Sequence, residues 1–136
     1  TFSASERPIN THLICESYAI VGEVAVVPYA RMGTVELAEA VAVAAQTSSA
    51  LLMSNHGAVT TGNDLLEAFN RLEVVEAAAH QTMLGDIIGS VHPLSKPQLD
   101  ELDLLMGREV KDGDHDESPS GFSEDKGKEC TASAAP

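Results

Sequence analysis

Aromatic side chains are scarce in this sequence of 136 residues. There is no tryptophan, and phenylalanine and tyrosine together make up only 4% of the chain. The hydrophobic fraction of 43% is still that of a globular protein, so a core has to be built mainly from Leu, Val, Ala and Met. The length allows one domain with a core of its own.

Basic residues are also few. The chain has 8 Lys and Arg against 21 Asp and Glu, which gives a formal net charge of −13. Nucleic acid and anionic membrane surfaces attract positive charge, so this balance argues against both as partners. No apolar run approaches the ~20 residues that a membrane-spanning helix needs, and the first residues do not read as a basic-then-apolar leader.

Only two cysteines are present, Cys15 in an apolar run and Cys130 in a polar segment. Their separation and their unlike surroundings favour two free thiols in a reducing compartment over a disulfide. Together with the missing membrane signals, this predicts a cytoplasmic protein.

Apolar periodicity and capping residues predict an alternation of strands and helices. The β-branched run before Pro28 is typical of a short strand, and Thr34 is a suitable N-cap for the helix after it. A second apolar strand follows, after which Asn63 or Asp64 can cap a long helix that Gly85 ends. The predicted strands cover residues 24–27, 50–55 and 58–61, and the predicted helices cover residues 35–46, 64–84 and 97–106.

The order strand, helix, strand with short links is a βαβ unit, which favours parallel pairing of the two strands. The predicted fold class is therefore α/β, a layered α/β/α arrangement around a central sheet, formed by residues 1–106. From Gly107 the composition turns acidic and polar. Residues 107–136 cannot bury enough apolar surface to offset the entropy of ordering, so we expect a disordered tail. Within it, residues 112–116 favour a solvated acidic segment over a cation-binding loop.

The chain is organised around the stretch from Ala50 to Val59. An apolar run of strand length leads to Asn55 and His56, and Gly57 then allows a sharp turn. Strand ends of α/β sheets commonly carry the chemistry of the fold, and histidine is the commonest metal ligand and proton shuttle near neutral pH. These residues by themselves leave two interpretations open, a functional histidine or one that only hydrogen-bonds a loop.

Three blocks of residues surround and include this histidine. They are Pro28-Tyr29-Ala30-Arg31-Met32-Gly33-Thr34-Val35-Glu36-Leu37, Asn55-His56-Gly57 and Gly62-Asn63-Asp64-Leu65-Leu66-Glu67-Ala68-Phe69. In this order and spacing they resemble the class II aldolase/adducin family, and the resemblance extends from about Arg7 to Gly85. The family includes fuculose-phosphate and rhamnulose-phosphate aldolases, ribulose-phosphate 4-epimerase, methylthioribulose-phosphate dehydratase and the adducin head domain.

The resemblance implies a zinc enzyme in which His56 is a metal ligand. A catalytic zinc takes three protein ligands and keeps an open position, yet no two histidines here stand two, three or four residues apart. In the family the other two ligands form a His-x-His pair, which we expect upstream of Thr1. The chain is accordingly expected to be the C-terminal part of the catalytic domain, with a fold that is incomplete at the N-terminus.

The resemblance also implies that Tyr29 and Met32 bind substrate, with packing between loop and sheet as the alternative. It assigns no catalytic residue to this chain. The acid/base glutamate of the family would lie further upstream, and the tyrosine near the final helix of the aldolases has no counterpart. Glu76, a polar member of an otherwise apolar helix stripe, is interpreted either as a partner of a metal ligand or as a solvated glutamate.

The implied function is cleavage, epimerisation or dehydration of a phosphorylated ketose through an enediolate that zinc stabilises. The implied partners are this sugar phosphate and further copies of the chain in a homo-oligomer, a tetramer in the full-length protein. Two alternatives remain, a non-catalytic, adducin-like oligomerisation module and an inactive truncated homologue. We expect this chain alone to be inactive, because it offers one zinc ligand where three are required.

Overall fold

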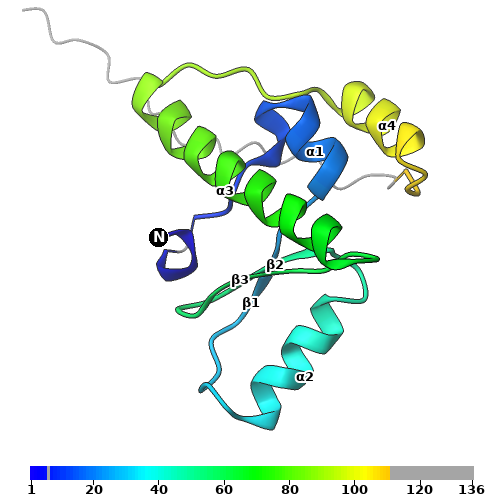
Figure 1. Cartoon of the computed structure of the whole chain (residues 1–136). Helices are drawn as coiled ribbons and strands as arrows, with labels where there is room; N and C mark the ends of the chain where they lie inside the picture. The colour runs from blue at the N-terminus through cyan, green and yellow to red at the C-terminus, as the bar shows by residue number, and fades with distance from the viewer. Residues whose placement is uncertain (6, 111–136) are drawn as a thin grey trace, which may run out of the picture.

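The computed structural model describes residues 1–5 and 7–110. A three-stranded sheet lies at its centre (Figure 1). The strands, in their order across the sheet, are β1 (Ala25–Val27), β2 (Ala50–Met53) and β3 (Gly57–Thr60). β1 and β2 run parallel, whereas β2 and β3 form an antiparallel hairpin. The parallel pair confirms the βαβ unit expected from the sequence.

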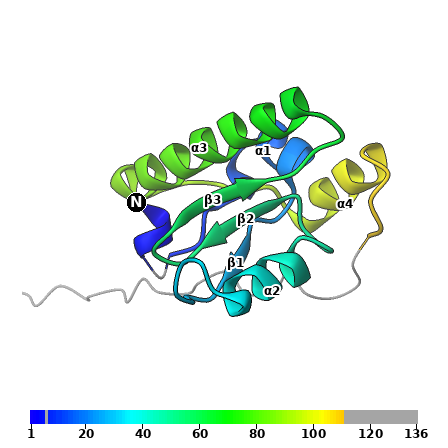
Figure 2. The same ribbon diagram turned by 60° about the horizontal axis from the view of Figure 1, so that its bottom comes forward.

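Helices cover both faces of this sheet. Within the described residues these are the short 3-10 helices η1 (Phe2–Ala4) and η2 (Thr11–Leu13) and the α-helices α1 (Cys15–Val21), α2 (Val35–Ala44), α3 (Leu65–Ile88) and α4 (Lys96–Leu105). α1 and α3 lie on one side of the sheet and α2 lies on the other, as Figure 2 shows. α4 packs against α1. The layered α/β/α fold class is therefore confirmed.

The three predicted helices begin where the capping residues place them. Thr34 Oγ1 accepts a hydrogen bond from Leu37 N at 3.4 Å at the start of α2. Asp64 Oδ1 accepts one from Glu67 N at 2.8 Å at the start of α3. These oxygens satisfy backbone donors that the first turn of a helix leaves unpaired. Ser95 begins a capping box at the start of α4.

The sequence does not predict α1. Its residues lie in a stretch where polar positions interrupt the apolar ones without a helical period. Seven residues are also too few for a helix that is stable alone. Tertiary packing stabilises α1 instead, because its buried residues Ser17, Tyr18 and Val21 lie in a helix that contacts α3 and α4.

The expectation that Gly85 ends the long helix is wrong. α3 continues to Ile88, and Gly85 is buried inside it, where a Cβ atom would stand 3.1 Å from Val91 Cγ1. Glycine at this position permits the returning chain to pack closely on the helix. The helix ends instead at Gly89, whose φ of 79° is left-handed and typical of a residue that follows a helix.

The core lies between the sheet and α3. Ala50 and Leu52 alternate with Leu51 along β2, so they project from one face of the sheet, where they pack with Val75 and Ala78 of α3. Leu51 projects from the opposite face, which α2 covers, and is only 1% exposed. β2 is thus buried on both faces, as the central strand of a three-layer fold has to be.

None of the helices in the described residues is long and apolar enough to cross a membrane. Cys15 is an exposed free thiol, and Cys130 lies outside the described residues. Residues 111–136, including the acidic segment at 112–116, also lie outside them. The disordered tail and the domain boundary at residue 106 therefore stay predictions.

We expect Leu51→Ala to lower the free energy of unfolding by about 2–5 kcal/mol, because it empties a fully buried position and leaves a cavity. Val26→Ala in the neighbouring strand is the matched control. Val26 is 58% exposed, so its truncation should cost about 0.5 kcal/mol or less. Urea unfolding followed by circular dichroism measures both losses. Equal losses in the two variants would contradict the central position of β2.

Candidate functional site

His56 ends a short turn that joins β2 to β3. The strand predicted to reach residue 55 ends at Met53, and His56 N donates a hydrogen bond to Met53 O at 3.0 Å. Asn55 in this turn has a φ of 60°, a left-handed conformation that asparagine tolerates better than most residues. Ser54 N donates to Val27 O at 3.0 Å, which ties the turn to the end of β1. The hairpin therefore holds His56 at the carboxyl edge of the two parallel strands.

The imidazole of His56 is half-buried and hydrogen-bonded to the loop that follows β1. Its Nε2 lies 2.8 Å from Ala30 O. A carbonyl oxygen only accepts, so Nε2 carries the proton and the lone pair of the neutral ring is on Nδ1. Metal-binding histidines commonly donate one ring N–H to a carbonyl and bind the metal with the other nitrogen. The hydrogen-bonding and the metal-binding interpretations of His56 are thus compatible.

The ring of Tyr29 stacks on the ring of His56. The centroids are 5.6 Å apart and the planes differ by 8°, an offset parallel arrangement that is typically worth about 0.5–1.5 kcal/mol. Tyr29 is nevertheless 62% exposed, and Met32 in the same loop is 78% exposed. The structure brings Tyr29 to His56 and leaves Met32 at the surface of the loop, where a small molecule can reach both side chains.

The described residues do not form a complete zinc site. In residues 1–5 and 7–110, no three His, Cys, Asp or Glu side chains stand close enough together to hold a metal ion. His12 pairs with Glu23 at 2.6 Å, and His80 is exposed on α3. His56 therefore fits zinc as a single ligand, and the described part of the chain does not supply the others.

Glu76 lies on α3 at a cavity of about 260 Å³, together with His80 one turn further along the helix. Residues of η1, α3 and the start of β3 line this cavity, and most of the other lining side chains are apolar. Glu76 itself is exposed. This is the position expected of a solvated glutamate at the edge of an apolar stripe, one of the two interpretations of its pattern.

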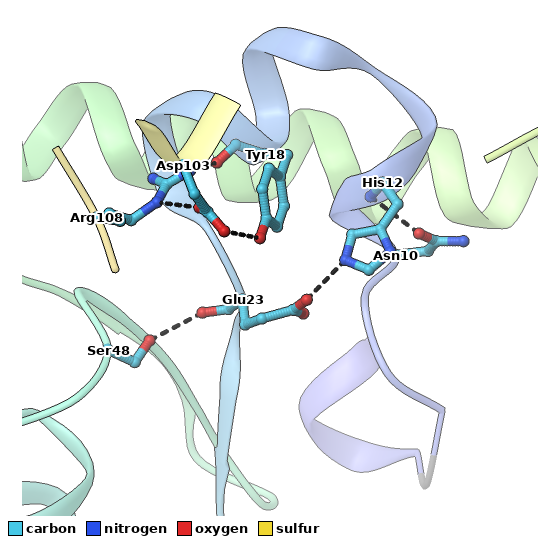
Figure 3. A network of polar contacts seen from close by, with 7 residues as sticks. All are labelled: Asn10, His12, Tyr18, Glu23, Ser48, Asp103 and Arg108. Carbon is cyan, nitrogen blue, oxygen red and sulfur yellow. Dashed lines mark hydrogen bonds and ion pairs between the residues drawn. The ribbon is translucent and has the colours of Figure 1, made fainter. Parts of the chain in front are cut away.

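A buried polar network that the sequence does not predict joins α1 to α4 (Figure 3). The hydroxyl of Tyr18, which is buried, donates to Asp103 Oδ2 at 3.0 Å. Arg108 Nε donates to Asp103 Oδ1 at 2.7 Å, so both oxygens of this buried carboxylate are paired. The guanidinium also donates to the carbonyl oxygens of Tyr18 and Ala19 near the end of α1. The Tyr18 oxygen accepts from Gly22 N at 2.7 Å as well. Arg108 thus fastens the segment after α4 to α1.

The same network extends to η2 and to the segments that lead into β1 and β2. His12 Nε2 lies 2.6 Å from Glu23 Oε1, and the His12 ring packs edge-on against Tyr18 at 5.2 Å between centroids. Ser48 Oγ donates to Glu23 O at 2.9 Å. Tyr18 and Asp103 are 85 positions apart in the sequence, so no local motif could have revealed their contact.

Comparison with known proteins assigns the chain to a family. Residues 1–83 match the sequence model of the class II aldolase and adducin N-terminal domain. This match covers more than half of the chain, and the chain therefore belongs to the class II aldolase/adducin family. The family resemblance found in the sequence is confirmed.

Curated relatives of two kinds match parts of the chain. The 3-oxo-tetronate 4-phosphate decarboxylase of Haemophilus influenzae is 44% identical over 59 residues, which are 43% of this chain and 28% of the relative. The L-fuculose phosphate aldolase of Methanococcus maripaludis is 33% identical over 88 residues, which are 65% of this chain and 47% of the relative. The chain thus spans less than half the length of these two relatives.

Solved structures show the same fold. YgbL from Klebsiella pneumoniae matches with a TM-score of 0.65 at 34% identity, over 74% of this chain and 50% of that one. An L-fuculose 1-phosphate aldolase matches with a TM-score of 0.69 at 29% identity, over 78% of this chain and 50% of that one. Both likenesses agree with the layered arrangement of Figure 2.

Tyr18 should make stability depend on pH in alkaline solution. Burial, and then the hydrogen bond to Asp103 and the charge of that carboxylate, raise the pKa of Tyr18 well above its ordinary value. The folded protein therefore keeps the phenol proton at pH values where the unfolded chain has lost it. The free energy of unfolding should fall as pH rises above about 10, by up to about 1.4 kcal/mol per pH unit, while below that pH the contribution is fully present.

Urea unfolding from about pH 8 to about pH 11 measures this slope. Tyr18→Phe removes the ionisable group, so its stability should fall less steeply with pH than that of the wild type. Tyr29→Phe, which changes the exposed tyrosine, should keep the wild-type slope. Parallel curves for the wild type and Tyr18→Phe would contradict the burial of the Tyr18 hydroxyl.

Proposed function

We propose that this protein is a zinc-dependent lyase that acts on a phosphorylated sugar or sugar acid, with His56 as one of its metal ligands. Membership of the class II aldolase/adducin family supports this proposal. The relatives named above are an aldolase of fuculose phosphate and a decarboxylase of 3-oxo-tetronate 4-phosphate. Both names describe the breaking of a carbon–carbon bond in a phosphorylated compound, which is the reaction class proposed here.

The observation that carries the proposal is the restrained imidazole of His56. Its Nε2–H is committed to Ala30 O at 2.8 Å, so Nδ1 is the nitrogen that would hold the metal. A bound zinc ion supplies positive charge that stabilises an oxyanion on the substrate. A neutral imidazole binds zinc without cancelling that charge. Tyr29 and Met32, exposed on the adjacent loop, would border the substrate.

A catalytic zinc needs three protein ligands, and the described residues offer His56 alone. As the family resemblance implies, we place the other two ligands, a His-x-His pair, on a segment preceding residue 1. A single imidazole binds zinc weakly, because affinity arises from convergent ligands that are already positioned. On this basis the 136-residue chain is inactive by itself and the full-length protein carries the activity.

The proposal includes a homo-oligomer in the cytoplasm. Large apolar side chains stand exposed near the end of α3 and on α4, and these include Ile87, Ile88, Leu104 and Leu105. Exposed apolar surface of this kind is typical of an interface, and the free thiol of Cys15 suits a reducing compartment. An adducin-like oligomerisation module would use such surfaces without a metal, which makes metal content the deciding measurement.

In the full-length protein we expect one zinc ion per chain and a loss of zinc affinity of more than about 100-fold in His56→Ala. The loss of partners outside the ligand shell already costs about 10–100-fold, and a ligand contributes more. His92→Ala, which changes an exposed histidine elsewhere, is the matched control and should keep its zinc. Metal analysis after dialysis against a chelator measures the zinc content of the wild type, His56→Ala and His92→Ala.

Three outcomes would contradict this assignment. Unchanged zinc in His56→Ala would remove His56 from the metal site. Tight, stoichiometric zinc in the 136-residue chain would show that the ligands outside it are not needed. A zinc-free wild type of full length would leave the adducin-like module as the better description.

Two assays distinguish the two reactions that the relatives' names describe. Aldol cleavage of fuculose 1-phosphate releases an aldehyde, and decarboxylation of 3-oxo-tetronate 4-phosphate releases carbon dioxide. We expect the zinc-loaded full-length protein to turn over one of the two compounds, and His56→Ala to lose that activity while His92→Ala keeps it. Turnover of neither compound would contradict the proposed pair of reactions.

A further inference from the structure

The loop that follows β1 holds the His56 ring with two consecutive residues. Ala30 O accepts the Nε2 proton at 2.8 Å, a contact in the plane of the ring. The ring of Tyr29 lies nearly parallel to the imidazole, with the centroids 5.6 Å apart, a contact across its face. The hydrogen bond determines which nitrogen carries the proton, and the stacked ring opposes tilting of the imidazole plane.

The loop is itself fixed at both ends. Ala30 is buried. At the start of the loop, Ser54 N donates to Val27 O at 3.0 Å, and where α2 begins, Thr34 Oγ1 donates to Arg31 O at 2.6 Å. Because the loop is held at both ends, it can restrain the side chain of His56.

Core packing does not account for the tyrosine at this position. The side chain of Tyr29 is mostly exposed, so burial contributes little to keeping it in place. Its stack on His56 is the specific contact that the ring makes. A tyrosine that only binds substrate would not need to lie parallel to the imidazole.

We infer that Tyr29 is a positioning residue, which acts through His56 by holding the imidazole so that Nδ1 is presented to a divalent metal ion. The metal in this statement rests on the proposed function. The restraint of the ring is a property of the chain and can be measured without any metal.

Long-range ¹H–¹⁵N correlation spectra of the 136-residue chain show which ring nitrogen of each histidine carries the proton. At about pH 8, above the ordinary titration range of histidine, we expect His56 in the Nε2–H form and the exposed His80 with both tautomers averaged. His56→Gln identifies the His56 signals. Tyr29→Leu, which removes the ring, should move these signals toward the averaged position, whereas Tyr29→Phe should preserve them.

Three results from these correlation spectra would overturn the inference. The first is an averaged tautomer at His56 in the wild type, and the second is an unchanged His56 signature in Tyr29→Leu. The third is an equal change in Tyr29→Leu and Tyr29→Phe, which would assign the effect to the hydroxyl. Nuclear Overhauser contacts between the two rings in the wild type test the same geometry when the leucine variant does not fold, and their absence overturns the inference.

Titration of the same variants of the full-length protein with Zn²⁺ separates this inference from the proposed function. We expect Zn²⁺ to shift the His56 signals, with an affinity about tenfold weaker in Tyr29→Leu and unchanged in Tyr29→Phe. If Zn²⁺ leaves His56 unshifted while the tautomer result holds, the proposed metal role is refuted and the restraint by Tyr29 is supported. If Zn²⁺ binds His56 equally in all three proteins, the positioning role is refuted and the proposed function stands.

Discussion

The burial of β2 is the constraint on which the rest of the described structure depends. Ala50, Leu51 and Leu52 are all buried, so this strand needs a partner on each edge and a cover on each face. β1 and β3 supply the edges, and α3 and α2 supply the covers (Figure 1). His56 takes its place from the same arrangement, because it stands in the turn that leaves β2 and that a hydrogen bond ties to β1.

A second constraint, the pairing of a buried carboxylate, holds α4 and the segment after it against α1. Asp103 is buried, and a buried carboxylate is costly unless its oxygens are paired. Tyr18 and Arg108 pair them (Figure 3). Arg108 also donates to the carbonyl oxygens of Tyr18 and Ala19 near the end of α1, a helix too short to be stable alone. α1 and α4 therefore stabilise each other through charges that neither helix could bury by itself.

The network around Asp103 and the surroundings of His56 differ in a way that bears on function. Around Asp103 both carboxylate oxygens have partners, so the network stabilises the fold and offers little to a ligand. Around His56 one ring nitrogen is committed to Ala30, while Tyr29 and Met32 stay largely exposed on the adjacent loop. A fixed histidine beside an accessible loop is the arrangement that a ligand site needs.

The sequence by itself determined the strands, three of the four α-helices in the described part of the chain and the position of His56 after a buried strand. Helix-capping residues, the pattern of apolar and polar residues and the block around His56 each involve only a few neighbouring residues, so a local stretch of sequence is enough to recognise them. Only the tertiary structure decided that α1 forms, that Gly85 admits Val91 instead of ending α3, and that Tyr18 meets Asp103. The formation of α1 and the contact of Tyr18 with Asp103 depend on segments far away in the sequence, and a local pattern cannot show which distant segment will supply a contact. The packing of Val91 on Gly85 depends on the path that the chain takes after α3, which a local pattern does not show either.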